Sequence, residues 1–238
     1  MGDAASSAST HAPKTALDQR SAILLASAVL IAPGLLNALY MEPLYEASRA
    51  GYWLADSLQY AVLPAGVAWL LMTRARVRPV EWGFRPWRAR RGPLDYAALF
   101  LLICFLYWLA YEPVRKVAYA HLWRGAPAFG SWTAIPKAFW PHLLVVMYYS
   151  VSAGLVEEVA YRGLPWLYLS RFTFRRGKTP LYVLSTSLLF AAAHSEQGPH
   201  SVIAAFSLGV VSAMLYAGFQ DLWPFVVAHI VTDVISFW

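Results

Sequence analysis

The 238-residue chain has few charged residues: Asp, Glu, Lys and Arg make up 13% of it, against about 25% in a typical soluble domain. Hydrophobic residues account for 59%. This composition excludes an ordinary soluble domain and predicts an all-α, polytopic membrane protein. Cysteine is almost absent, and with Cys104 alone an intramolecular disulfide is excluded. The net charge of +6 does not indicate nucleic-acid binding, because the basic residues lie in short loops between apolar segments.

Seven apolar segments reach or approach the roughly 20 residues that a helix needs to cross a hydrocarbon core of about 30 Å. They cover residues 21–40, 55–73, 94–114, 139–169, 180–196, 201–219 and 222–237. A re-entrant or interfacial helix between Arg115 and Lys137 would make eight. Residues 1–20 are rich in Ala, Ser and Thr and are predicted to form a flexible cytoplasmic tail. Residues 21–238 are then a single transmembrane helical bundle, with the candidate catalytic motifs in 150–237.

Basic residues predict the orientation of the chain in the membrane. The loop from Arg74 to Arg91 holds seven arginines against one acid, Glu81, and the loop from Arg171 to Lys178 is also basic. Because Lys and Arg are enriched in cytoplasmic loops, both loops are expected in the cytoplasm. The N-terminus then lies in the cytoplasm and the C-terminus outside.

Two adjacent carboxylates, Glu157 and Glu158, lie inside the apolar segment of residues 145–169. An ionisable group at bilayer depth costs about 3 kcal/mol on insertion scales, so such groups usually face the protein interior and mark function. On a helix, Glu158 shares a face with Arg162 at the i, i+4 spacing of an ion pair, whereas Glu157 shares its face with Tyr161. We therefore expect Glu158 to be neutralised by Arg162, and Glu157 to face a cavity.

Two further polar motifs lie on apolar helices: Phe190-Ala-Ala-Ala-His194 and His229-Ile-Val-Thr-Asp233. Each histidine alone can be a hydrogen-bonding partner between helices. Together with Glu157, these residues supply a general base, proton carriers and an oxyanion stabiliser, which hydrolysis of an amide by water requires. The same Glu157, His194 and His229 are also a possible zinc ligand set with an open position. A site without a cofactor and a zinc site are therefore both considered.

The three motifs resemble those of the CPBP intramembrane protease family, which includes the type II CAAX prenyl endopeptidases (Rce1-like) and the abortive-infection proteins. The resemblance covers about residues 150–237 and includes Ser187-Leu-Leu-Phe190 and the segment from Asp221 to His229. It implies a catalytic cavity within the membrane that opens to the cytosol. It also implies cleavage of membrane-associated substrates, among them prenylated CAAX-type proteins.

The resemblance implies a role for each motif residue. Glu157 and His194 would activate the water, and His229 and Asp233 would stabilise the oxyanion or take part in proton transfer. The remaining motif residues would support the site: Glu158, Tyr161 and Arg162.

Two residues depart from the family pattern. Asp233 stands where prenyl-protein proteases of the family tend to carry Asn, and an ionised Asp cannot donate a hydrogen bond to an oxyanion. Pro165 removes the backbone hydrogen bond to Tyr161 and is predicted to kink or end the helix. Three glycines are predicted to permit close helix packing: Gly154, Gly163 and Gly209.

Two other functions compete with an endopeptidase. A proton-coupled carrier would also use buried Glu and His, but it predicts further polar residues across the membrane, and the first three segments contain few. A family member that has lost proteolysis would act as a membrane scaffold. The expected partners are membrane lipid and a membrane-tethered peptide or protein substrate, without nucleic acid, and the sequence does not indicate the oligomeric state.

Overall fold

The computed structural model describes residues 18–86, 92–122, 130–172 and 176–238, which are helical and contain no strand. The elements in chain order are α1 Gln19–Ala47, α2 Arg49–Ser57, η1 Leu58–Val62, α3 Leu63–Thr73, α4 Pro79–Trp82, α5 Pro93–Leu122, η3 Ser131–Ala134, α6 Phe139–Glu158, η4 Val159–Gly163, α7 Leu164–Phe172, α8 Lys178–Ala192, η5 Ser195–Gln197, α9 Pro199–Phe219 and α10 Trp223–Phe237. The predicted all-α bundle is confirmed.

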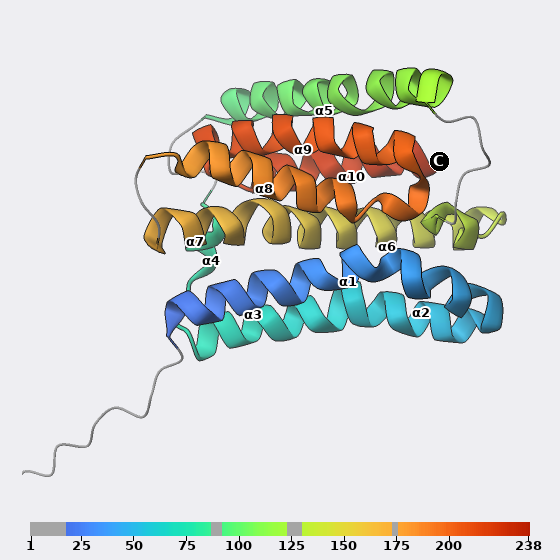
Figure 1. Ribbon diagram of the computed structural model, residues 1–238, viewed down its shortest axis with the longest axis horizontal. Coiled ribbons are helices and arrows are strands. Elements are labelled where there is room, and N and C mark those ends of the chain that lie inside the picture. Colours follow the sequence, from blue (N-terminus) through green and yellow to red (C-terminus); the bar gives the residue numbers. More distant parts are fainter. Residues whose placement is uncertain (1–17, 87–91, 123–129, 173–175) are drawn as a thin grey trace, which may run out of the picture.

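Each predicted apolar segment corresponds to one helical rod, and the rods run side by side (Figure 1). Two rods are composite. The tyrosine rod joins α2, η1 and α3 over Arg49–Thr73, and the glutamate rod joins α6, η4 and α7 over Phe139–Phe172. Within the described residues, five rods are long and apolar enough to cross a membrane, and α10 is a shorter apolar helix. The chain thus has the helices of a multi-pass membrane protein.

Several predicted boundaries differ from the structure. Helix α1 continues to Ala47, and α5 continues to Leu122, so the start of the Arg115–Lys137 connection is helical. Arg115 and Lys116 extend α5 because both pair with Glu112, at 3.0 and 3.3 Å. In the described part of that connection, only η3 follows α5. The predicted tail lies mostly outside the described residues.

The two basic loops lie at the same end of the bundle. Arg171 at the end of α7 forms an ion pair with Glu81 of α4, and the side chain of Gln19 donates to the carbonyl of Ala75 at 2.8 Å. Figure 1 shows α4 and α7 at this end together with the start of α1. Residues 87–91, which include three of the predicted arginines, lie outside the described residues. The cytoplasmic placement of this end stays a prediction.

Close packing at the three glycines is confirmed. A methyl group added to Gly154 of α6 would lie 3.2 Å from the Val226 carbonyl oxygen of α10, and one added to Gly209 of α9 would lie 2.9 Å from Cα of Ser187 on α8. A methyl group on Gly163 would lie 2.5 Å from the backbone of α4. The contact at Gly154 matters most for the site, because it seats α10 directly against the helix that carries the glutamates.

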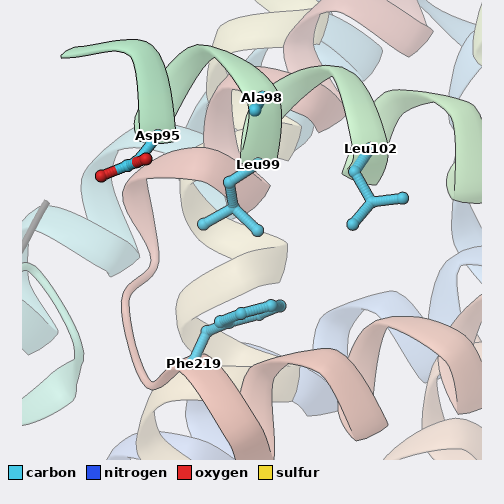
Figure 2. Close-up of a pocket in the computed structure, with 5 residues that line it drawn as sticks. All are labelled: Asp95, Ala98, Leu99, Leu102 and Phe219. Carbon is cyan, nitrogen blue, oxygen red and sulfur yellow. The ribbon is translucent and has the colours of Figure 1, made fainter. Parts of the chain in front are cut away.

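Two surface hollows lie beside the first turns of α5, away from the glutamates. One is shown in Figure 2, where Phe219 from the end of α9 faces Leu99 and Leu102 of α5. The other lies between α5 and α10 and is lined mainly by aromatic and apolar side chains, including Phe100 and Trp223. Neither hollow is lined by a predicted site residue.

Candidate active site

The glutamates lie where the glutamate rod changes its helical geometry. Glu158 is the last residue of α6, and Val159–Gly163 form a π-turn in which the N–H of Leu164 donates to the carbonyl of Val159. Pro165 offers no N–H to the Tyr161 carbonyl, so a regular α-helical turn would be incomplete here. The helix does not end at Pro165. It widens by one residue instead, and π-turns of this kind are frequent at functional sites.

The tyrosine rod contains a second π-turn, Leu58–Val62, and the N–H of Leu63 donates to the carbonyl of Leu58. Here too a proline, Pro64, follows two residues after the π-turn ends. This turn packs against α6. The two irregular turns therefore lie on neighbouring rods, with the glutamates close to both.

Glu158 and Arg162 form a fully buried ion pair. Their side chains are 0% and 1% exposed, and Arg162 Nε lies 3.4 Å from Glu158 Oε2. The guanidinium also donates to the Ser212 hydroxyl, at 2.6 Å from Nη2, and lies 4.5 Å from the ring centroid of Phe190. A buried ion pair is tolerated when such additional contacts replace water. The predicted pairing of Glu158 with Arg162 is confirmed.

Glu158 also forms a hydrogen bond with His229, which the sequence did not predict. Its Oε1 accepts hydrogen bonds from His229 Nδ1 at 2.9 Å and from the Tyr107 hydroxyl at 3.2 Å. Because a carboxylate only accepts, the hydrogen on this contact belongs to Nδ1 of His229. Tyr107 on α5 and Ser212 on α9 belong to no motif. A hydroxyl inside an apolar span was their only sequence signal.

Glu157 lies in a different environment from its neighbour. Its side chain is 16% exposed, and its Oε2 is 3.8 Å from Nε2 of His229. Its Oε1 accepts a hydrogen bond from the Tyr60 hydroxyl at 3.4 Å. Asp233, 20% exposed, places Oδ2 at 3.6 Å from the same Nε2. The structure thus groups Glu157, His229 and Asp233 around one partly accessible ring nitrogen.

His194 lies two residues beyond the end of α8, in the turn before η5, so the predicted position inside an apolar helix is wrong. Its Nδ1 is 2.8 Å from the Phe190 carbonyl, which can only accept, so Nδ1 carries the hydrogen and Nε2 of the neutral ring is an acceptor. The centroid of the Phe190 ring lies 4.6 Å from the centroid of the His194 ring and 5.2 Å from that of the Tyr161 ring. Among the described residues, no hydrogen bond or ion pair joins His194 to Glu157 or His229.

A zinc site was the alternative interpretation of the same residues. In the described parts of the chain, no group of three or more His, Cys, Asp and Glu side chains is arranged to hold a metal ion. Nε2 of His229 faces Glu157 and Asp233, and within the described residues no hydrogen bond or ion pair joins His194 to these side chains. The described side chains are not arranged as a preformed metal site.

Comparison with known proteins agrees with the motifs. The sequence model of the family described as Type II CAAX prenyl endopeptidase Rce1-like matches residues 138–235. No curated protein and no solved structure matches the chain. The matched segment runs from the start of α6 almost to the end of α10, so it holds all the motif residues, whereas Tyr60 and Tyr107 precede it. Together with the long apolar helices, this match identifies an integral, multi-pass membrane protein whose C-terminal part is similar to the Rce1-like CAAX-type intramembrane proteases.

Proposed function

We propose that the protein is an intramembrane endopeptidase that hydrolyses a peptide bond of a membrane-associated substrate with water activated by Glu157 and His194. The unequal environment of the two glutamates carries the proposal. Glu158 is sealed among its partners, whereas Glu157 is partly exposed and lies beside His229. A general base must be reachable by water and substrate. Of the two glutamates, Glu157 meets this requirement.

The reaction begins with a water molecule between Glu157 and His194. Glu157 takes a proton from this water while Nε2 of His194 accepts a hydrogen bond from it, and the oxygen attacks the peptide carbonyl. His229, held at Nδ1 by Glu158, donates from Nε2 in its imidazolium form to the oxyanion. The C–N bond then breaks, and Glu157 returns its proton to the leaving nitrogen.

Asp233 acts on His229 in this scheme and not on the oxyanion. An ionised carboxylate has no hydrogen to donate, and Oδ2 of Asp233 lies 3.6 Å from Nε2 of His229. Its charge stabilises the imidazolium form from which His229 donates. Arg162 keeps Glu158 ionised, and Tyr161 packs against Phe190 on the side of His194.

The substrate is proposed to approach from the cytoplasmic end. The start of α1 and the two basic loops share one end of the bundle, and positive loops favour the cytoplasm. The expected partners are membrane lipid and a membrane-tethered peptide or protein, prenylated CAAX-type proteins included.

The test is cleavage of a membrane-tethered peptide by purified protein in detergent. Glu157→Gln, His194→Ala and His229→Ala should each lower kcat by about 10²- to 10⁴-fold, and the helical content should remain. Glu46→Gln removes an exposed carboxylate of α1 and should retain full activity. Unchanged cleavage by all three site variants would overturn the proposal. Activity that disappears on chelation and returns with Zn²⁺ would replace the metal-free scheme by the zinc alternative.

One observation favours the proton-coupled carrier as a second candidate. Asn37 on α1 and Asp56 and Gln59 on the tyrosine rod are buried. Proton flux into proteoliposomes, recorded with a pH-sensitive dye, separates the two functions. A carrier would lose this flux in Asp56→Asn, whereas an endopeptidase gives no flux and cleaves peptide in the same vesicles.

A further inference from the structure

The two π-turns meet at Glu157. Tyr60 is the middle residue of the π-turn Leu58–Val62, and Glu157 lies two residues before the π-turn Val159–Gly163. The hydrogen bond of 3.4 Å from the Tyr60 hydroxyl to Oε1 of Glu157 links the two rods at this point. Tyr60 lies outside the segment that matches the Rce1-like family.

The two glutamates differ in how many groups fix their orientation. Glu158 accepts hydrogen bonds from His229 and Tyr107 and forms an ion pair with Arg162. Among the described residues, the Tyr60 hydroxyl is the group that donates a hydrogen bond to Glu157, and Nε2 of His229 is 3.8 Å from Oε2. A carboxylate on a flexible side chain needs such a contact to keep one orientation.

We propose that Tyr60 is a positioning residue, which orients Glu157 for the reaction proposed above. The inference rests on the proposed function. The hydroxyl donates to Oε1, so Oε2 is directed toward His229 and is the oxygen that accepts the proton of the water. A hydrogen bond to the charged form of a carboxylate favours that form.

The π-turn explains why Tyr60 can reach Glu157. A π-turn adds one residue to the helical turn and changes which side chains face a neighbouring helix. Pro64 follows the turn and cannot supply the N–H of a regular α-helix. The local sequence therefore favours the widened turn, and the widened turn packs Tyr60 against α6.

Other charged and titratable groups surround Glu157 and enter the pH dependence of the reaction. They lie on the glutamate rod, the segment after α8, η5 and α10: Tyr161, Arg162, His194, Glu196, His229 and Asp233. Removal of the Tyr60 hydroxyl leaves all of them in place, so a change in the pH profile can be assigned to the lost hydrogen bond.

The experiment compares Tyr60→Phe with the matched control Tyr149→Phe. Tyr149 lies on the same rod as Glu157, and its buried hydroxyl pairs with that of Tyr52 at 2.9 Å. Tyr60→Phe should lower kcat for a membrane-tethered peptide by about 10- to 100-fold, the effect of one hydrogen bond to a charged group. KM should stay unchanged, and the pH profile of kcat should differ from that of the wild type. Tyr149→Phe should move neither.

The outcomes separate this inference from the proposed function. If Glu157→Gln is inactive and Tyr60→Phe keeps the kcat and pH profile of the wild type, the inference is wrong and the proposed function stands. If Tyr60→Phe loses activity only in parallel with its folded fraction, with the profile unmoved, Tyr60 is structural and the inference is again wrong. If Glu157→Gln cleaves as fast as the wild type, the proposed function itself fails.

Discussion

The two faces of the glutamate rod differ in how far their charged side chains are buried and paired. On one face, Glu158 and Arg162 are almost completely buried, and Ser212, Tyr107 and His229 bond to them from three other helices. On the other face, Glu157 remains partly exposed and, within the part of the chain that the structure describes, accepts a hydrogen bond from one hydroxyl. The first face is a closed network in which the charges of Glu158 and Arg162 neutralise each other. The second leaves one carboxylate available for chemistry, and the comparison teaches that adjacent identical residues can serve stability and reaction separately.

The largest loss of stability is expected from Arg162→Met on the closed face, the face that carries Glu158 and Arg162. It leaves the Glu158 carboxylate buried without its cation, so the free energy of unfolding should fall by about 3–5 kcal/mol. Thermal unfolding in detergent measures the loss. Arg115→Met is the control, because Arg115 pairs with Glu112 in a partly exposed position and should cost less than about 1 kcal/mol. Equal effects of the two variants would contradict the contrast between the faces.

The close packing of α6 against α10 at Gly154 is tested by Gly154→Ala. The added methyl group would meet Ile230 and the Val226 carbonyl, so α10 must move and carry His229 away from both glutamates. We expect a loss of about 1–3 kcal/mol in stability together with a fall in kcat. Gly66→Ala, where no atom lies within 4 Å of the new methyl group, should do neither. A fully active Gly154→Ala protein would show that the position of α10 tolerates this displacement.

A milder change on the closed face is Ser212→Ala. It removes the hydroxyl that accepts from the Arg162 guanidinium and should lower the free energy of unfolding by about 1–3 kcal/mol, since a buried charged donor loses its acceptor. The kcat should change little, because Glu158 and His229 keep their own hydrogen bond. Chemical denaturation and peptide cleavage on the same preparation give both quantities. A large loss of kcat at unchanged stability would mean that Arg162 belongs to the reactive face.

The smallest effect is expected from Asp233→Asn on the open face. The amide keeps an oxygen that can accept from Nε2 of His229 but removes a negative charge, so kcat should change by less than about tenfold, or 1.4 kcal/mol. Asp233→Ala removes the acceptor as well and should be slower than Asp233→Asn. A loss far above tenfold in Asp233→Asn would assign the charge of Asp233 a direct part in the reaction.

The sequence was sufficient for the architecture and for the Glu158–Arg162 pair. Apolar length predicted the seven rods, and the i, i+4 spacing predicted the ion pair at 3.4 Å. The contacts of Tyr60, Tyr107 and Ser212 were not predictable, because they depend on which distant helices pack together. The bond between Glu158 and His229 joins residues 71 positions apart, and helical periodicity carries no information on such a pair. The end of α5 was missed because Glu112 pairs with Arg115 and Lys116, which extend the helix beyond its apolar stretch.

The π-turns have a consequence for how the chain tolerates insertions and deletions. A π-turn is equivalent to one residue inserted into an α-helix, and each residue of a regular helix rotates the chain by about 100°. Deletion of one residue from Leu58–Val62 or from Val159–Gly163 would regularise that rod and rotate everything beyond the deletion relative to Glu157. The geometry around this carboxylate therefore depends on the number of residues in each turn as well as on their identity. A sequence that keeps every motif residue but lacks one position in either turn would differ in the orientation of its site.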